Sequence, residues 1–265
     1  MKELILIKLG GSVITDKSME FTVRPENIKR LGGEIKAALK VFSGAIVIGH
    51  GAGSFAHTPA KKYQTKKGLI NSKSLMGMSI VEDAARQLNA IVIKEFIKEN
   101  LPVFPFSPAS FIISDTLISI KSYIDPLEHL LLTGGHPVIY GDVIMDKKQG
   151  CTIFSTEKIL SIIAKKLIKN YKIRMIYVTD VDGVYDENGK TIPVITSKNF
   201  DQLKSSILGA RNVDVTGGML HKVEESLKLA KTIGIKTQIV NGTKAGGLMN
   251  AILGKGRLSS TLVKK

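Results

Sequence analysis

The sequence predicts an α/β fold in which a mostly parallel sheet is covered by helices on both faces. Short apolar runs alternate along the chain with longer segments of helical periodicity, and this alternation is typical of repeated strand–helix–strand units. Most of the apolar runs are continuous rather than alternating, which indicates strands buried on both faces. Glycine-rich turns directly follow several of these runs, as expected where parallel strands end.

The predicted strands are short, rich in β-branched residues and bounded by glycine or polar residues. Their length separates them from buried helices, which need more residues to cross a core. In chain order they are Leu4–Leu9, Ala45–Ile48, Pro137–Tyr140, Arg174–Thr179 and Thr237–Val240.

The predicted helices lie between these strands and repeat apolar residues at intervals of three and four. The first begins at Arg24-Pro25, because proline is favoured in the first turn of a helix. The predicted helices are Pro25–Val41, Ser74–Glu99, Thr156–Lys169 and Met219–Thr232.

The chain of 265 residues fits one domain made of two lobes. No internal repeat or linker divides it, and the best division is the turn-rich segment Asp146–Gly150. We therefore expect an N-terminal lobe of about residues 1–148 and a C-terminal lobe of about residues 149–265 within a single domain.

The formal net charge of +15 raises two possibilities, a nucleic-acid-binding protein or a lysine-rich protein that binds small anions. Of the 38 basic residues 32 are lysine, and they are scattered in pairs along the chain. Tryptophan is absent and there are only six tyrosines for base stacking. These observations favour anionic ligands over nucleic acid.

The lone cysteine, Cys151, cannot form an internal disulfide, so a disulfide-stabilised secreted scaffold is excluded. The uncharged stretch Leu101–Ser114 is shorter than the ~20 apolar residues of a membrane-spanning helix and contains three prolines. The N-terminal stretch Leu4–Ile14 carries Lys8 and lacks the cleavage pattern of a signal peptide. We expect a soluble, cytoplasmic protein with no membrane partner.

Polar, glycine-rich segments follow three predicted strands, and a fourth opens a predicted helix. They are Gly10-Gly11-Ser12, Gly49 to His57, Asp180 to Tyr185, and Asp214-Val215-Thr216-Gly217-Gly218. Glycine lets backbone N–H groups approach an oxyanion, and a helix N-terminus attracts negative charge. Ligands of parallel sheets bind outside the carboxyl ends of the strands. Together with Lys8, Lys17 and Lys222, these turns predict a polyphosphate site.

Two familiar nucleotide motifs do not fit. Gly51, Gly53 and Ala56 match the dinucleotide fingerprint loosely, but the stretch Lys73–Val81 lacks the acidic residue expected about 20 positions later. The segment from Gly183 to Gly189-Lys190-Thr191 has one residue too many for a Walker A loop.

Five glycine-containing motifs are spread over essentially the whole chain. They are Lys8-Leu9-Gly10-Gly11-Ser12, His50-Gly51-Ala52-Gly53, Gly141-Asp142, Thr179-Asp180-Val181-Asp182-Gly183-Val184-Tyr185, and Asp214-Val215-Thr216-Gly217-Gly218-Met219 with Lys222. In order and spacing they resemble the amino acid kinase superfamily. His57 follows the second motif and Lys17 follows the first. A histidine and a lysine at these two places resemble the pattern of the archaeal type of isopentenyl phosphate kinase.

This resemblance implies a three-layer α/β/α sandwich, a homodimer, and an N-terminal lobe that binds the phosphoryl acceptor while the C-terminal lobe binds ATP with Mg²⁺. It implies nucleotide contacts for Lys8, Gly10, Gly11, Ser12, Gly53, Asp180, Tyr185, Gly217 and Lys222, and acceptor contacts for Ala52, His57 and Gly141. Ala52 and Ala56 stand where the family commonly has glycine, and Lys158 replaces an acidic residue. No metal ligand is therefore assigned to the protein.

The expected reaction is ATP-dependent phosphorylation of isopentenyl phosphate, a small phosphate monoester, to isopentenyl diphosphate. Phosphoryl transfer depends on positioning and charge stabilisation, for which Lys8, Lys17 and His57 are the candidate catalytic residues. A phosphate monoester has a second pKa of about 6, so it is largely a dianion at pH 7. Its oxygen can therefore attack without a general base to remove a proton. Met78 and Val81 are hypothesised to contact the branched alkyl chain, although core packing explains them equally well.

Three alternatives remain open at this point. Another superfamily member that phosphorylates a phosphate or phosphonate, such as a uridylate or fosfomycin kinase, comes first. Kinases with carboxylate acceptors, such as acetylglutamate, glutamate or aspartate kinases, are disfavoured by His57 and by the lack of an arginine cluster. A basic nucleic-acid-binding protein is the most remote alternative.

Overall fold

The computed structural model describes residues 1–209, 218–255 and 260–265, and its centre is an eight-stranded sheet. All neighbouring strands in it are parallel except β11 and β12. The order is β10 (Val194–Thr196), β12 (Ser260–Lys264), β11 (Lys236–Asn241), β9 (Tyr171–Thr179), β1 (Lys2–Leu9), β2 (Ala45–His50), β6 (His136–Tyr140) and β3 (Val103–Pro105).

A second, four-stranded sheet is formed by two strands that precede β6 in the chain and two that follow it. Its order is β5 (Ile118–Ser122), β4 (Ile112–Asp115), β7 (Asp142–Asp146) and β8 (Gly150–Phe154). The Asp146 carboxylate joins two of its turns. It accepts hydrogen bonds from the backbone N–H groups of Thr116 and Leu117 beside β4, at 3.3 and 3.1 Å, and from Lys148 and Gln149 after β7, at 3.0 and 3.1 Å.

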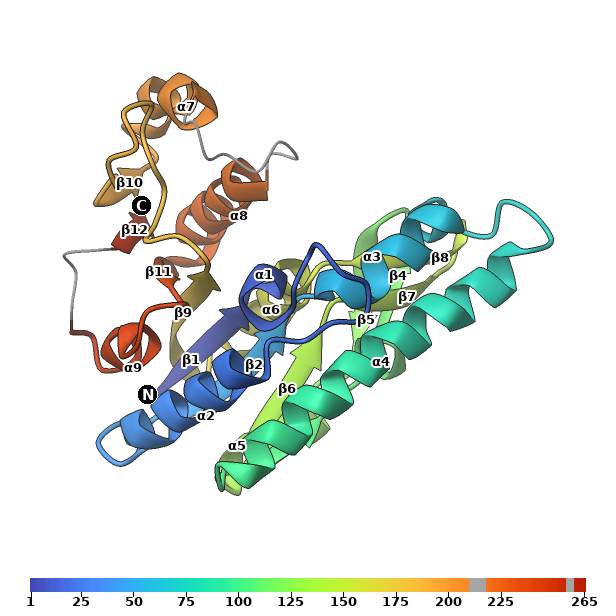
Figure 1. The fold of residues 1–265 in the computed structure, drawn as a ribbon, viewed down its shortest axis with the longest axis horizontal. Coiled ribbons are helices and arrows are strands. Elements are labelled where there is room, and N and C mark those ends of the chain that lie inside the picture. The colour runs from blue at the N-terminus through green and yellow to red at the C-terminus, as the bar shows by residue number, and fades with distance from the viewer. Residues whose placement is uncertain (210–217, 256–259) are drawn as a thin grey trace.

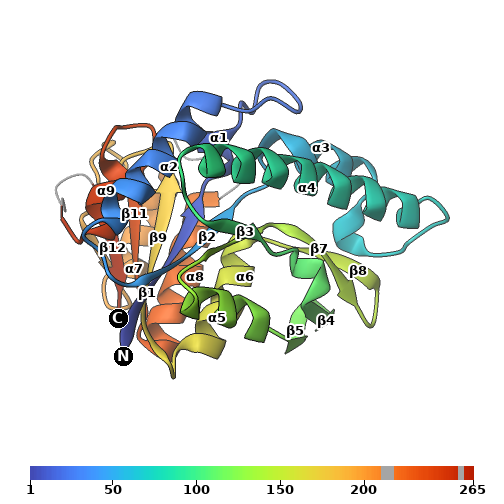
Figure 2. The same ribbon diagram turned by 90° about the horizontal axis from the view of Figure 1, so that it is seen from below.

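Helices cover both faces of the large sheet and complete three layers (Figures 1 and 2). One face carries α1 (Gly11–Ile14), α2 (Pro25–Leu39), α4 (Ser74–Lys98) and α9 (Gly247–Ile252), with α3 (Gly53–Lys62) beside α4. The opposite face carries α5 (Asp125–Leu132), α6 (Thr156–Leu167) and α8 (Gly218–Ile233), with α7 (Phe200–Gly209) near the edge formed by β10. Short 3₁₀ turns occupy Thr65–Lys67 and Pro108–Ser110.

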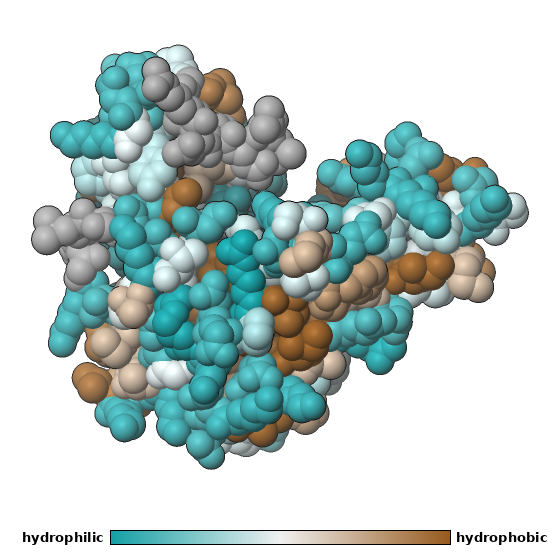
Figure 3. Space-filling model, viewed as in Figure 1, coloured by the Kyte–Doolittle hydropathy of each residue, from teal (hydrophilic) through white to brown (hydrophobic). Residues whose placement is uncertain are grey.

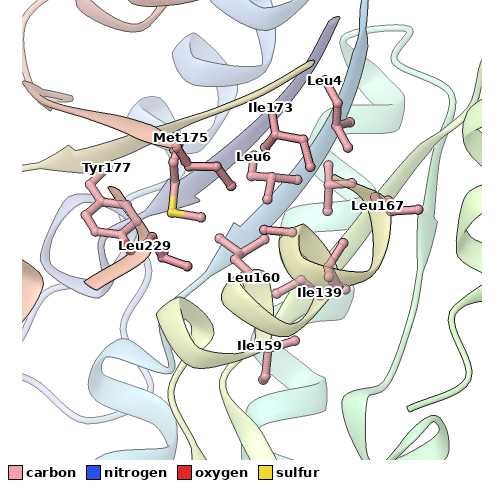
Figure 4. Packing of buried hydrophobic residues seen from close by; sticks show 14 of the residues in the cluster. Leu4, Leu6, Ile139, Ile159, Leu160, Leu167, Ile173, Met175, Tyr177 and Leu229 are labelled. Carbon is pink, nitrogen blue, oxygen red and sulfur yellow. The ribbon is translucent and has the colours of Figure 1, made fainter. Parts of the chain in front are cut away.

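Two hydrophobic cores lie on the two faces of the sheet, since alternate residues of each strand point in opposite directions. On β1, Leu4 and Leu6 belong to the core beneath α6 and α8, whereas Ile5 and Ile7 belong to the core beneath α2 and α4. Figure 4 shows the first core, where side chains from β1 and β9 meet Leu160 of α6 and Leu229 of α8. Burial on both faces explains why the central strands are continuous apolar runs.

The structure confirms the predicted α/β sandwich, and every predicted strand and helix occurs within a few residues of its expected bounds. The segment Asp146–Gly150, where the sequence suggested dividing the chain, is the hairpin turn between β7 and β8. Cys151 is a buried free thiol on β8. Among the described residues, no helix combines the length and apolar character needed to cross a bilayer.

Candidate active site

A cleft of about 1500 Å³ opens at the carboxyl ends of β1, β2 and β9. Its described lining comes from both halves of the chain and includes ten lysines but only four carboxylates. The surface is indented between the lobe that carries α7 and the arm formed by α3 and α4 (Figure 3). An excess of cationic side chains in a concave site attracts polyanionic ligands.

Two glycine turns meet at the floor of the cleft. Gly10 and Gly11 connect β1 to α1, and Gly51 to Gly53 connects β2 to α3. A Cβ on Gly11 would lie 2.8 Å from both Cα and N of Gly53, so the two turns require glycine where they touch. Thr15 links them, since its hydroxyl donates to Gly11 O at 2.7 Å and accepts from Ser54 N at 3.0 Å.

The backbone conformations explain why alanine is tolerated within the second turn. Gly53 has a φ of +52°, in the left-handed region that favours glycine, and a Cβ there would collide with Thr15. Ala52 has a φ of −70° and a ψ of −16°, a right-handed helical conformation open to any residue. Alanine at position 52 therefore keeps this turn in an unstrained backbone conformation.

Lys8 and Glu157 form a buried ion pair beside the glycine turns. Lys8 lies near the end of β1, Glu157 lies in the first turn of α6, and Lys8 Nζ is 3.0 Å from Glu157 Oε1. Burial by itself raises the pKa of the Glu157 carboxyl, but the charges of Lys8 and Lys222 help to lower it to about 2. The carboxylate is thus ionised between cations that come from the two halves of the chain.

The structure places His57 and Lys17 on the same cleft as Lys8. His57 is the fifth residue of α3 and is exposed, so it lies on a helix rather than within the glycine turn that precedes it. Lys17 follows α1 in an exposed loop, where the neighbouring Asp16 accepts hydrogen bonds from Ser18.

The C-terminal half contributes Asp180 and Tyr185 after β9, and Lys222 on α8. Lys222 Nζ donates to Gly218 O at 3.0 Å, which holds this side chain at the start of α8. Gly217 lies outside the described residues. A single cleft is therefore lined by Lys8 and His57, which are candidate catalytic residues, and by Lys222 of the predicted polyphosphate site.

The predicted acceptor-site residues divide into two groups. Ala52, Gly141 and Val81 line the cleft, and Val81 is almost completely buried at its wall. Met78, one turn earlier on α4, packs against the small apolar cluster that contains Val81 and is not among the described residues lining the cleft. The core-packing explanation fits Met78, whereas Val81 borders the space available to a ligand.

Several cleft residues were not assigned from the sequence. Asp142, the first residue of β7, is buried and accepts from its own neighbour Val143 N at 2.7 Å and from Ser107 Oγ at 3.3 Å. Burial raises its pKa to about 7, with Glu82 adding to the effect. Lys158 lies 3.6 Å from the centre of the Phe154 ring and donates to Leu117 O in the β4–β5 hairpin. The only sequence signals were the Gly141-Asp142 pair and the lysine at position 158.

No group of three or more histidine, cysteine or carboxylate side chains within the described ranges could hold a metal ion. The described lining instead offers glycine turns, hydroxyl groups, lysines and His57. These donors fit a polyphosphate, which can bring a divalent cation bound to its own oxygens.

Comparison with known proteins gives a consistent assignment. The family model of the amino acid kinase family matches residues 3–241. Isopentenyl phosphate kinase from Methanocaldococcus jannaschii is 33% identical over 262 residues, covering 95% of this chain and 96% of the relative. Isopentenyl phosphate kinase from Methanothermobacter thermautotrophicus is 34% identical over 272 residues, covering 95% of this chain and 96% of that relative. Acetylglutamate kinase from Pelagibacter ubique is more distant, at 26% identity.

A solved structure of an isopentenyl phosphate kinase superposes with a TM-score of 0.83 at 28% identity and covers 99% of this chain and 100% of its own. The match extends over both faces of the sheet and over both halves that line the cleft. The resemblance found in the five sequence motifs is thereby confirmed, and the chain belongs to the amino acid kinase family.

Proposed function

We propose that this chain transfers the γ-phosphoryl group of ATP to isopentenyl phosphate and releases isopentenyl diphosphate and ADP. The observation that carries the proposal is the single cleft, which gathers glycine turns, His57 and lysines from both halves of the chain. The similarity to isopentenyl phosphate kinases over nearly the full length supports this acceptor.

The nucleotide side of the cleft is assigned to the C-terminal half together with the first glycine turn of the N-terminal half. Asp180 and Tyr185 face the nucleoside, while Lys222 and the turn at Gly10 and Gly11 bind the phosphates. Backbone N–H groups at glycine turns and helix N-termini suit phosphate oxygens, since they donate without a bulky side chain. Mg²⁺, bound to the phosphates of ATP, would offset their charge during transfer.

The acceptor side is assigned to α3 and its preceding turn. His57 donates to the acceptor phosphate, the amide of Ala52 faces the same group, and Gly141 leaves room beside it. Val81 contacts the alkyl chain at the wall of the cleft. No general base is needed, because the acceptor phosphate is already largely a dianion near neutral pH.

Transfer then proceeds in line. An acceptor phosphate oxygen bonds to the γ-phosphorus, the bond from that phosphorus to the β–γ bridging oxygen breaks, and ADP leaves with the electron pair. Charge accumulates on the equatorial oxygens of the transferring group, where Lys8, Lys17 and Lys222 stabilise it. Glu157 fixes the position of Lys8 through the 3.0 Å ion pair.

A coupled assay of ADP release tests the proposed acceptor with isopentenyl phosphate, UMP, fosfomycin and N-acetylglutamate in parallel. We expect kcat/KM for isopentenyl phosphate to exceed the others by at least about 100-fold, because the apolar wall at Val81 offers no partner to the polar groups of the other acceptors. Faster turnover of another acceptor would refute the assignment.

The role of His57 is tested by His57→Ala, with His129→Ala on the exposed surface of α5 as the matched control. Loss of the donor that holds the acceptor phosphate and stabilises the developing phosphate–phosphate bridge should lower kcat by about 100- to 1,000-fold. The control should keep the wild-type rate. Near-normal turnover of the His57 variant would reject its catalytic role while leaving the acceptor assignment to the first assay.

A further inference from the structure

His50, the last residue of β2, is completely buried beneath the glycine turn that lines the cleft. Its ring is stacked on Tyr140 of β6, with centroids 5.7 Å apart and planes inclined by 18°. Nδ1 lies 3.1 Å from Gly51 O and Nε2 lies 3.0 Å from the side-chain amide of Asn89 on α4. Both ring nitrogens therefore have fixed partners.

The partners determine where the ring carries its proton. Burial, together with the nearby charge of Lys8, lowers the pKa of His50 to about 4, so the ring is neutral at pH 7. A carbonyl oxygen can only accept, so Nδ1 must donate to Gly51 O. Nε2 is then unprotonated and accepts from Asn89 Nδ2.

This hydrogen bond orients the peptide between Gly51 and Ala52. No described peptide bond is cis, so the Ala52 N–H points away from the Gly51 carbonyl. The carbonyl faces the buried ring, so the N–H points away from that ring, and both Gly51 and Ala52 line the cleft. Within the described ranges, the Ala52 N–H has no hydrogen-bond acceptor from the protein, which leaves it available to a ligand.

The backbone of His50 connects the same turn to two other parts of the cleft wall. Its carbonyl oxygen accepts from Thr156 Oγ1 at 2.6 Å and from Gly141 N at 3.2 Å. Thr156 begins α6 and stands next to Glu157, the partner of Lys8. Residue 50 thus joins the acceptor side of the cleft to the segment that holds Lys8.

We propose that His50 is a positioning residue that fixes the Gly51–Ala52 peptide so that the Ala52 N–H donates to the phosphate of the acceptor. The assignment rests on the proposed function, because it needs a phosphate to bind at this turn. It predicts that the loss of the Nδ1 donor weakens acceptor binding more than ATP binding.

Two substitutions separate the ring nitrogens. His50→Asn places an amide near the position of Nδ1 and can still donate to Gly51 O, whereas His50→Gln reaches the position of Nε2 and leaves that carbonyl without its donor. We expect His50→Gln to raise KM for isopentenyl phosphate by about 10- to 100-fold, the value of one hydrogen bond to a charged group. His50→Asn should raise it by less than about threefold, and KM for ATP should change by less than about twofold in both variants.

The wild-type enzyme in the same assay separates the two hypotheses. No turnover of isopentenyl phosphate by the wild type would refute the proposed function. An active wild type with equal KM values in both variants, or with equal increases for acceptor and ATP, would overturn the role of His50. Long-range ¹H–¹⁵N spectra of the wild-type histidines give a readout that needs no variant. If His50 positions the Gly51–Ala52 peptide, its Nδ1 must be protonated. A proton on Nε2 instead would overturn the positioning role even if a variant failed to fold.

Discussion

Asp142→Asn is the substitution whose effect follows most directly from the structure. The carboxyl is buried at the start of β7, and burial raises its pKa from 3.8 to about 7. An acid with a higher pKa in the folded state binds more protons when folded, so it makes the protein less stable as pH rises from about 4 to about 7. Above that range the loss is complete.

The magnitude comes from the two pKa values. A shift of about 3 units corresponds to about 4 kcal/mol, at about 1.4 kcal/mol for each unit. Asparagine has nearly the same shape and can retain the hydrogen bonds to Val143 N and Ser107 Oγ without ionising. The unfolding free energy of the variant should therefore rise relative to that of wild type by about 2–3 kcal/mol between pH 5 and pH 8.

Urea unfolding of both proteins across this pH range measures the difference. Other titrating groups contribute equally to the two proteins, so their effects cancel. The same charge lines the cleft beside the proposed acceptor site, so KM for isopentenyl phosphate should increase above about pH 7 in wild type and much less in the variant. A difference in unfolding free energy that does not change with pH would refute the buried, neutral carboxyl.

Three further substitutions test the cleft. Gly11→Ala would bring a Cβ within 2.8 Å of the Gly53 backbone, so we expect its free energy of unfolding, measured in urea, to fall by about 1–3 kcal/mol. The control Gly33→Ala, which would make only ordinary contacts on α2, should not lower the free energy of unfolding. Glu157→Gln removes a carboxylate whose pKa is lowered from 4.5 to about 2, which predicts about 3 kcal/mol less stability at pH 7; this difference should disappear as pH falls from about 4.5 to about 2. Val81→Phe should raise KM for isopentenyl phosphate about tenfold or more by filling the cleft, and Met78→Phe should not; equal effects would contradict the separation of these two positions.

The large sheet was predictable because its central strands have a local signature. β1, β2 and β9 are continuous apolar runs, since both of their faces are covered. The small sheet has no such signature. β5, with the sequence Ile-Ser-Ile-Lys-Ser, has no fully buried residue, and its pairing depends on β4, which in turn pairs with the distant β7.

The site was partly predictable for a similar reason. The glycine turns that end β1 and β2 can be located from the sequence, and they lie beside Lys8 and His57 on the cleft that Lys222 of α8 also lines. The pairing of Lys8 with Glu157 could not be predicted, because it depends on how α6 packs against β1. The properties of His50 and Asp142 likewise arise from burial among residues distant in the sequence, although both belong to motifs that were recognised.

The place of β1 in the sheet has a consequence for how the protein is made. β1 pairs with β2 on one side and with β9, which begins at Tyr171, on the other. A ribosome therefore completes this first strand long before its second neighbour emerges, and until then one edge stays open to other chains. Expressing residues 1–148 alone would leave that edge of β1 uncovered permanently, and expressing residues 149–265 alone would leave the matching edge of β9 uncovered, so neither half completes the sheet without the other.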